Sequence, residues 1–380
     1  MKNNKIRILI LDGDHKNALA IIRHLGKTKD YIIDVISYSK ASVGFYSKYT
    51  NNRIITESPK KNSTAFISKI VETIKKNNYT AIIPVSYISF QLCSKNRSSI
   101  EKYTSITIAS PEVIKIASSK VETYKLSEKL GIPYPKVFNI NDINDINNLE
   151  INYPCVVKAP FEAGKNIVEY AKNKTDLIKK FNKIVDENDF NGVFPIVQHF
   201  IVGEGVGFFA YYIEGKCVNY FVHKRIREYP ITGGASTVAE SFFNQDVINN
   251  GKKILDYLQW EGVAMVEFKK DNSTGEYNLM EINAKFWGSL DLALAAGINF
   301  PQMIIDTAKG NIINKSEYEK IRFQWILNGD LFHLLENPKI FFSFLKDLFI
   351  SNSDFYFSDL LPNLFQILNI PIHYYKKWFK

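Results

Sequence analysis

The stretch from Gly262 to Gly288, GVAMVEFKKDNSTGEYNLMEINAKFWG, constrains this chain more than any other. It reads as two β-strands joined by a tight turn at Ser273-Thr274-Gly275, where glycine supplies the positive φ that such a loop needs. Side chains alternate between the two faces of a strand. This alternation predicts two triplets that each share a face: Val263, Met265 and Glu267 on the first strand, and Leu279, Glu281 and Asn283 on the second.

Folding the hairpin at this turn places Glu267 opposite Glu281 and Phe268 opposite Met280. Facing Cβ atoms lie roughly 5 Å apart. Two bare charges at that distance repel by roughly 3 kcal/mol at an effective dielectric of about 20. A Mg²⁺ ion reverses the sign, and it takes carboxylate and amide oxygens together with substrate phosphates. A metal site including Asn283 is therefore one interpretation, and an exposed hairpin with two unrelated acids is the other.

Length and composition set the broad class of the protein. A chain of 380 residues exceeds one ordinary core, so two or three domains are expected. The hydrophobic fraction of 46% and the charged fraction of 23% are typical of a soluble globular protein. The sequence contains no run of about 18 uncharged apolar residues, so no membrane-spanning helix is expected. The N-terminus, MKNNKIRILILDGDHKN, reads as a buried strand rather than a signal peptide.

Charge and cysteine content indicate the compartment and the partners. The net charge of +9 favours anionic partners such as nucleotides, acidic sugars or a membrane surface. The lysines are scattered rather than grouped, which does not favour nucleic-acid binding. Three cysteines without metal-site spacing fit a reducing cytoplasm.

The first 112 residues alternate between strand and helix patterns, which predicts a small parallel α/β domain. No G-x-G-x-x-G motif follows the first strand, so a dinucleotide site is not expected. Substrate binding at the strand ends and a purely structural role both remain open. The expected strands are 6–11, 31–37, 81–85 and 104–109, and the expected helices are 17–25, 65–75 and 89–96.

A lysine at a strand end marks the next unit. After a helix expected over 112–130, the apolar strand 153–160 ends with Lys158 beside the loop 161–166, which contains Gly164 and Lys165. A point charge plus backbone N–H groups suits a polyphosphate. A surface lysine is the alternative, and the absence of G-x-x-x-x-G-K-[ST] excludes a P-loop.

Two arginines follow a predicted hairpin over 206–222 that turns at Glu214-Gly215. Arg225 and Arg227 are two residues apart, so on a strand they should point the same way and could clamp a phosphate or a carboxylate. A solvated basic edge strand is the alternative. Further helices are expected over 246–258, 290–296 and 300–309.

The last 70 residues, 311–380, are rich in aromatic and apolar residues interrupted by charges. We expect a helical extension there. Its aromatic residues and lysines could sit at a membrane interface, cover the core or form a dimer contact.

In order along the chain, these motifs resemble the ATP-grasp superfamily, in particular the carbamoyl-phosphate-synthase-like carboxylate–amine ligases. The resemblance is strong over about 110–310 and looser over 1–110. It implies a mixed α/β and α+β fold: an N-terminal parallel α/β domain (1–112), a two-part ATP-grasp domain (113–310) with antiparallel sheets, and the extension 311–380. The ATP-grasp domain would divide into a lid subdomain (113–197) and an ATP- and Mg-binding subdomain (198–310). The motifs are Ser119-Lys120 with Gly131–Pro135, Pro154–Lys158, Val197–Ile201 with Gly203-Glu204, Lys224–Gly234, Met265–Phe268 and Met280–Leu290.

The resemblance also implies roles for particular residues. Lys120 and Lys158 would contact the ATP phosphates. Gln198, Phe200 and Ile201 would contact adenine, and Glu204 would contact the ribose. Glu267, Glu281 and Asn283 would bind the metal, and Arg225, Arg227 and Lys285 would contact the transferring phosphoryl group. Two positions depart from the family pattern. His199 stands where the adenine hinge often has Glu, and Lys285 stands where relatives commonly have Arg, so a bidentate clamp is not available there.

The implied activity is a cytoplasmic, ATP- and Mg²⁺-dependent (Mn²⁺ as substitute) ligase that joins a carboxylate to an amine through an acyl phosphate, releasing ADP and phosphate. Loops 161–166 and 231–236 are candidate lids. The acid and amine are left open among acidic sugars, amino acids and peptides, and a homodimer or a peripheral membrane contact is allowed. A catalytically silent nucleotide-binding regulator and a phosphotransferase without ligation are the alternatives.

Overall fold

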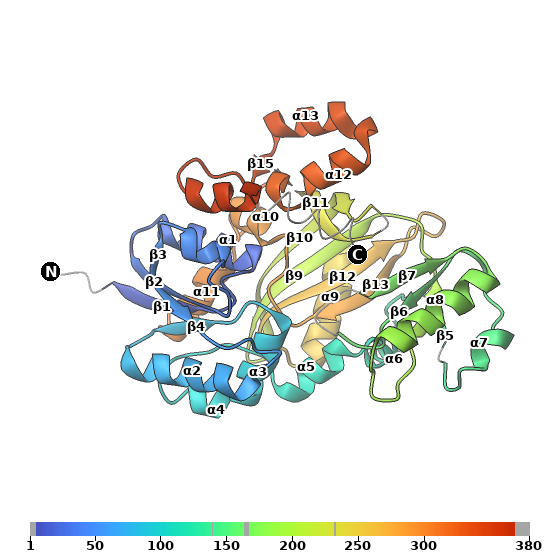
Figure 1. Ribbon diagram of the computed structural model, residues 1–380, viewed down its shortest axis with the longest axis horizontal. Coiled ribbons are helices and arrows are strands. Elements are labelled where there is room, and N and C mark those ends of the chain that lie inside the picture. The colour runs from blue at the N-terminus through green and yellow to red at the C-terminus, as the bar shows by residue number, and fades with distance from the viewer. Residues whose placement is uncertain (1–4, 139, 163–166, 232, 369–380) are drawn as a thin grey trace.

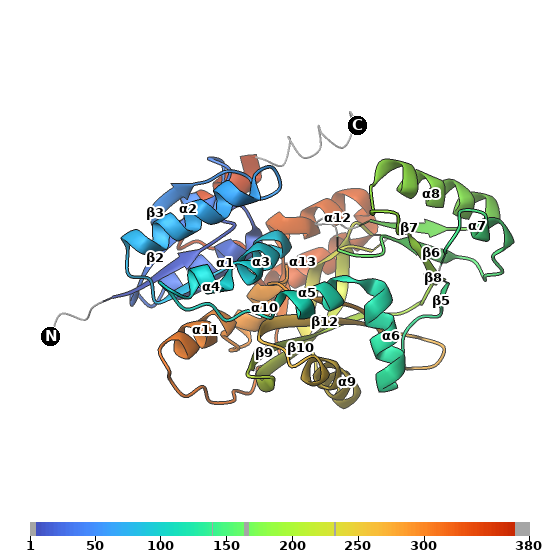
Figure 2. The same cartoon turned by 90° about the horizontal axis from the view of Figure 1, so that it is seen from below.

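The computed structural model of the protein describes residues 5–138, 140–162, 167–231 and 233–368. Its strands form a four-stranded parallel sheet, a seven-stranded sheet and a second four-stranded sheet. Figures 1 and 2 place the N-terminal domain and the small sheet at opposite ends of the molecule, with the seven-stranded sheet between them. Among the described residues, no helix combines the length and the apolar character that crossing a bilayer requires.

The N-terminal sheet has the order β3-β2-β1-β4 and is parallel throughout, as the alternating pattern predicts. The polar edge strand β3 was not expected, because TNNRII lacks apolar alternation. The strand expected over 104–109 is wrong: only Ser105 forms a bridge, to Ala81. Its apolar residues are buried without pairing into the sheet. The elements are β1 (Ile6–Ile10), α1 (Lys16–Gly26), β2 (Tyr31–Ser37), η1 (Val43–Tyr46), β3 (Thr50–Ile55), α2 (Ser63–Lys76), β4 (Ala81–Ile83), α3 (Tyr87–Lys95) and α4 (Arg97–Ile100).

The helix expected over 112–130 is two helices, α5 (Pro111–Ser118) and α6 (Lys120–Leu130). Ser119 interrupts the helix because its backbone is extended, and its hydroxyl accepts a hydrogen bond from the Glu122 N–H and so caps α6. At the far end Gly131 adopts φ +62°, the left-handed cap expected of glycine there. The break places Lys120 at the first turn of α6, where its N–H donates to the Pro160 carbonyl at 2.9 Å.

The small sheet has the order β5-β8-β6-β7 and is antiparallel throughout. The amphipathic helix α8 buries Leu177, Phe181 and Ile184 against it, which forms a core separate from the main one. The elements are β5 (Val137–Phe138), α7 (Asp145–Asn148), β6 (Cys155–Lys158), β7 (Val168–Ala171), α8 (Lys174–Glu187) and β8 (Ile196–His199).

The large sheet has the order β13-β12-β9-β10-β11-β14-β15. The predicted turn at Glu214-Gly215 joins β9 to β10, and both residues have positive φ. One hydrophobic core runs from this sheet into the N-terminal domain, so the two are packed together. The elements are β9 (Gly205–Ile213), β10 (Lys216–Tyr229), β11 (Ala235–Ser241), α9 (Gln245–Tyr257), β12 (Gly262–Lys270), β13 (Tyr277–Asn283), α10 (Leu290–Ala295) and α11 (Phe300–Ala308).

The C-terminal extension is only partly helical. Its first strand, β14 (Arg322–Gln324), pairs antiparallel with β11, and β15 (Asn352–Ser353) adds in parallel at the edge. The buried Arg23 of α1 donates to Asp359 at 3.0 Å, which ties the extension to the N-terminal domain. The helical elements are η2 (Ile326–Asp330), α12 (Leu331–Glu336), η3 (Pro338–Ile340), α13 (Phe341–Ile350) and residues 360–368.

Candidate active site

The β12–β13 hairpin brings the two predicted glutamates together. Glu267 pairs with Glu281 in the antiparallel register, as expected. The pairing of Phe268 with Met280 is wrong: Phe268 pairs with Leu279, because a bulge inserts Met280 as an extra residue. The bulge also separates Leu279 from the predicted face, since Leu279 is fully buried while Met280 and Glu281 both line a cavity.

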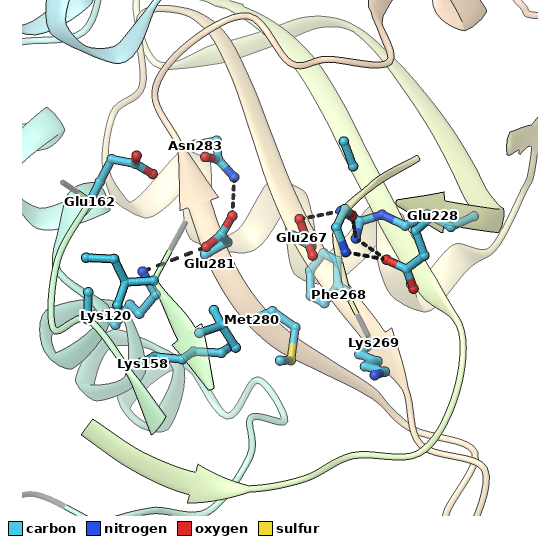
Figure 3. Close-up of a pocket in the computed structure, with 18 of the residues that line it drawn as sticks. Lys120, Lys158, Glu162, Glu228, Glu267, Phe268, Lys269, Met280, Glu281 and Asn283 are labelled. Carbon is cyan, nitrogen blue, oxygen red and sulfur yellow. Dashed lines mark hydrogen bonds and ion pairs between the residues drawn. The ribbon is translucent and has the colours of Figure 1, made fainter. Parts of the chain in front are cut away.

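This cavity, which we call the first cavity, lies between the small and the large sheets and measures about 350 Å³. Figure 3 shows Lys120, Lys158 and Glu281 on one side of it and Glu267 and Glu228 on the other. Side chains from β6, β10, β12, β13 and the start of α6 therefore meet in one place. Its charged lining consists of Lys120, Lys158, Glu162, Arg225, Glu228, Glu267, Lys269, Glu281 and Lys285.

Lysines surround Glu281. Lys120 Nζ lies 3.8 Å from Glu281 Oε2, and the Asn283 amide donates to Glu281 Oε1 at 2.8 Å. Burial by itself would raise the pKa of Glu281, but Lys120, the Asn283 hydrogen bond, Lys158 and Lys285 outweigh it and lower the pKa to about 2. Lys158 is 8% exposed, and its burial lowers its pKa to about 8 although Glu281 acts in the opposite direction. Glu281 is therefore a permanent anion next to a buried lysine.

The second glutamate has a different partner. Arg225 Nη2 donates to Glu267 Oε2 at 2.7 Å, while Nη1 lies 3.2 Å from Glu228 Oε2 and donates to the Gly234 carbonyl at 3.2 Å. Burial raises the pKa of Glu267, Arg225 opposes this, and the nearby Glu281 reinforces it. The repulsion anticipated between the two acids is thus present, and fixed cations on either side partly offset it.

Arg227 does not join Arg225, so the predicted two-arginine clamp is wrong. The β10–β11 register shifts on both sides of Arg227, which turns the two guanidinium groups to different surroundings. Arg227 donates to both carboxylate oxygens of Asp330, at 2.9 and 2.6 Å, and to Asp347 at 2.6 Å. It is 8% exposed and lines neither the first cavity nor a second cavity that lies beside the N-terminal domain. Its chemistry is that of a buried structural ion pair.

The residues expected to contact adenine and ribose lie on the connection from the small sheet to the large one, and none of them lines the first cavity. Gln198 is buried in β8, and its side-chain oxygen accepts a hydrogen bond from the Tyr124 hydroxyl at 3.0 Å. The Phe200 ring packs edge-on against Tyr170, with ring centroids 5.6 Å apart. Ile201 is buried, and Glu204 is exposed.

Lys285 follows the end of β13 and lines both the first cavity and a second, larger cavity beside the N-terminal domain. Its Nζ lies 3.4 Å from Glu162 Oε2. The candidate lids are described only in part, because residues 163–166, including Gly164 and Lys165, and residue 232 lie outside the described chain.

Comparisons with known proteins agree with this architecture. The family model described as "ATP-grasp in the biosynthetic pathway with Ter operon" matches residues 215–328. A D-aspartate ligase from Enterococcus faecium is 22% identical over 330 residues, which cover 80% of this chain and 77% of that protein. The solved structure of an L-amino acid ligase from Bacillus licheniformis aligns with a TM-score of 0.64 and 15% identity, covering 84% of this chain and 78% of that one.

A second solved structure is the biotin carboxylase domain dimer of Hydrogenobacter thermophilus 2-oxoglutarate carboxylase, in complex with MgADP, ADP and bicarbonate. It aligns with a TM-score of 0.65 and 15% identity, covering 83% of this chain and 73% of that one. The chain has the ATP-grasp fold. Within it, the first cavity lies between the small and the large sheets.

The oxygen donors in the ATP-grasp cleft suit Mg²⁺ bound together with a nucleotide. Among the described residues, no group of three or more His, Cys, Asp or Glu side chains could hold a metal unaided. Glu267, Glu281 and Asn283 offer two carboxylates and an amide, and all three line the first cavity. Mg²⁺ is usually held by one or two carboxylates plus substrate phosphates and water, so an incomplete protein cage of oxygens is the expected donor set.

Several residues of the ATP-grasp cleft were missed at the sequence level. Lys269 could have been found, because period two from Glu267 places it on the same face of β12. Glu228 could not, since only the bend of β10 brings it within reach of Arg225. Tyr124 of α6 does not line the cavity but supports it, since its hydroxyl donates to the Met280 carbonyl at the bulge, 3.1 Å away, and no sequence pattern indicated this contact.

Proposed function

We propose that this protein is an ATP- and Mg²⁺-dependent carboxylate–amine ligase. The observation that carries the proposal is the convergence, in one cleft of the ATP-grasp fold, of two carboxylates and an amide with the two lysines Lys120 and Lys158. The similarity to a D-aspartate ligase and to an L-amino acid ligase supports ligation over other uses of this fold.

The reaction class follows from the chemistry of the two substrates. A carboxylate does not react with an amine in water, because oxide is not a usable leaving group. A carboxylate oxygen of the acid therefore attacks the γ-phosphorus of ATP and ADP leaves, which forms an acyl phosphate. The amine nitrogen then attacks the acyl carbon, phosphate leaves and the nitrogen loses a proton. Positioning and charge placement provide most of the catalysis in such phosphoryl transfers.

Each side chain of the site contributes a charge at a fixed place. Lys120 and Lys158 bind the phosphates, and the buried position of Lys158 strengthens its field because little water screens it. Glu267, Glu281 and Asn283 would hold a Mg²⁺ ion, which would supply neutralisation of charge on the polyphosphate. Arg225 and Lys285 face the acid and the transferring phosphoryl, since both line the junction of the two cavities.

Gln198, Phe200, Ile201 and Glu204 form the proposed nucleoside contact, with backbone atoms of Phe200 and Ile201 as the adenine partners. These residues connect the two halves of the ATP-grasp fold, between β8 and β9. We also retain the domain division at 112 as a proposal. The predicted division at 197 falls inside β8 of the small sheet, and the one at 310 separates β14 and β15 from the large sheet to which they belong. A cytoplasmic location is proposed because all three cysteines are free and the reaction consumes ATP.

The function is tested by ADP release from MgATP with a panel of carboxylic acids and amines. We expect ADP and phosphate to form in equal amounts, only when a cognate acid and amine are both present, together with an amide product. Phosphorylated acid released without an amine would instead indicate a phosphotransferase. Nucleotide binding with no turnover across the whole panel would contradict the proposal and favour a regulatory binding protein.

We further propose that the C-terminal extension contacts an anionic membrane surface. Its helices and the turn before the last of them expose large apolar side chains: Phe342 is 82% exposed, Phe349 87%, Phe357 83%, Leu361 61% and Leu368 73%. This extension covers one side of the molecule, at the top of Figure 1. Residues 360–380 contain three lysines and no acidic residue, so their charge complements anionic headgroups. A homodimer contact is the alternative use of this surface.

Vesicle flotation tests the membrane proposal. We expect the protein to bind vesicles that contain phosphatidylglycerol, and not neutral ones. The double variant Phe342→Ser/Phe349→Ser should weaken binding at least about 10-fold, because each buried Phe contributes about 1.5–3 kcal/mol. Ile312→Ser is the matched control, since Ile312 is 89% exposed but precedes the helices of the extension. A dimer that the double variant dissociates, without vesicle binding by the wild type, would contradict the proposal.

A further inference from the structure

The second cavity measures about 670 Å³ and is built by the N-terminal domain together with the ATP-grasp cleft. All four parallel strands contribute residues that follow their carboxyl ends: Asp12 and Asp14 to Asn17 after β1, Tyr38 after β2, Ser58 to Lys60 after β3 and Val85 to Ile88 after β4. Ligands of open parallel sheets bind at this edge, where the strand order reverses. Here the reversal lies between β1 and β4, because β2 and β3 continue on the other side of β1. The N-terminal domain therefore lines a cavity at the edge of its sheet where ligands of such folds bind.

The second cavity joins the first beside the reacting groups. Both cavities are lined by Arg225, Glu267, Asn283 and Lys285. If the proposed function holds, the acid must place its reacting carboxylate at this junction, next to the γ-phosphate. The remainder of the acid then extends into the second cavity toward the ends of the N-terminal strands.

Asp14 is a carboxylate at those strand ends whose negative charge a cationic group of a ligand could neutralise. Its side chain is 21% exposed, and it lines the cavity. The Ser37 hydroxyl donates to it at 2.9 Å, the Tyr38 hydroxyl is a second hydrogen-bonding neighbour, and within the described chain no Lys or Arg pairs with it. The nearest base is His15, with Nε2 at 3.8 Å. Its negative charge is felt locally, because Asp14 is the main cause of the raised pKa of Tyr38.

The other charged groups on the N-terminal side are differently placed. The Asp12 carboxylate is already saturated by the N–H groups of Val85 and Ser86 and by the Ser89 hydroxyl. Lys16 is half-buried, and the nearby carboxylates of Asp354 and Asp291 oppose the effect of its desolvation, which lowers its pKa. Lys60 is exposed at the rim. Asp14 is thus the one carboxylate of this wall, among the described residues, with capacity for a new donor.

We propose that the acid substrate is an amino acid, with its ammonium group bound by Asp14 and its reacting carboxylate held near Arg225 and Lys285. A partly buried carboxylate is best stabilised by a counter-charge that also donates hydrogen bonds, which an ammonium does. A sugar hydroxyl would donate a hydrogen bond but leave the charge of Asp14 uncompensated. Trp287 gives the wall a further donor, because its buried Nε1 has no hydrogen-bond partner and the residue lines the same cavity. The cavity is larger than one amino acid requires, which leaves room for the attacking amine.

The test uses hydroxylamine in place of the unknown amine, because it converts an acyl phosphate to a hydroxamate with release of phosphate. The full-length protein is incubated with MgATP, hydroxylamine and matched acids: D- and L-aspartate against succinate, D- and L-glutamate against glutarate, D- and L-alanine against propionate, and glucuronate. We expect hydroxamate from at least one amino acid, and at least about 10-fold less from its des-amino partner.

Asp14→Asn should raise the KM for the preferred amino acid by about 10- to 100-fold, as expected for a lost charged hydrogen bond, with a much smaller change in kcat. The variant keeps an oxygen for the Ser37 hydroxyl, so the fold should persist. Asp30→Asn is the matched control, because Asp30 is exposed in the same domain and lines neither cavity. Its KM should match the wild type.

The outcomes separate the two proposals. Turnover with succinate, glutarate, propionate or glucuronate equal to or above that with the amino acids would overturn the amino-acid assignment and leave the ligase intact. An unchanged KM in Asp14→Asn would remove Asp14 from the site. Absence of ADP and hydroxamate with every acid would overturn the proposed function and the substrate assignment with it.

Discussion

Replacing Glu281 by glutamine should reduce kcat by about 100- to 1000-fold, the range seen when a fixed charge or dipole at a reacting centre is removed. Glu281 is held as an anion by Lys120, Asn283, Lys158 and Lys285, and it faces Glu267 across the hairpin. Glutamine keeps the shape but has no charge to bind Mg²⁺ or to balance the lysines. The measurement is ADP formation at saturating MgATP with the cognate acid and amine.

A second readout separates metal binding from chemistry. MgADP should raise the thermal midpoint of the wild type more than ADP with EDTA does, and Glu281→Gln should lose that difference. Glu276→Gln is the matched control, because Glu276 is an exposed residue at the turn of the same hairpin. Equal turnover by wild type and Glu281→Gln would contradict the assignment of Glu281 as a metal ligand. Activity that survives replacement of both Glu267 and Glu281 would contradict the ligase proposal.

Replacing Arg227 by methionine should destabilise the protein by about 3–5 kcal/mol, because the change leaves two buried carboxylates without a cation. Asp330 is fully buried and Asp347 is 2% exposed. Thr237 and Gln324 still donate to Asp330, and Arg322 still pairs with Asp347 at 2.9 Å, which limits the loss. The thermal midpoint should fall by about 4–6 °C, because the entropy of unfolding scales with chain length. Below that midpoint, kcat/KM should stay near the wild-type value, since Arg227 lines neither cavity.

The matched control is Lys224→Met on the same strand. Lys224 pairs with Glu240 at 3.1 Å, with side chains 26% and 21% exposed, so its loss should cost about 1 kcal/mol or less. Arg225→Met should show the opposite pattern to Arg227→Met, with activity lost more than stability. If Arg227→Met loses activity at a temperature where the fold is intact, the structural assignment of Arg227 is wrong and the residue contributes to the active site.

The hairpin could be predicted because its information is local. Alternation with period two and a glycine-bearing turn determine which residues face each other, and Glu267 pairs with Glu281 as predicted. The bulge at Met280 could not be predicted, because it depends on contacts from elsewhere, such as the hydrogen bond from Tyr124 to the Met280 carbonyl.

The arginines show the limit of the same rule. Period two predicts that Arg225 and Arg227 share a face, but an irregular register with β11 separates them. What draws Arg227 away is Asp330 and Asp347, about 100 residues further along the chain. No local pattern could reveal those partners, just as the polar edge strand β3 and the pairing of β14 depend on neighbours distant in sequence.

The amino-acid sequence by itself determined the order of the ATP-grasp motifs, the alternating N-terminal domain and the facing glutamates, because periodicity and turn chemistry act over a few residues. Only the tertiary structure decided which charges meet. The second cavity is formed by loops after four strands of one domain and by a hairpin more than 170 residues later. Asp14 lines this cavity only because these distant segments pack together. Long-range packing sets such distances, and a linear pattern does not contain them.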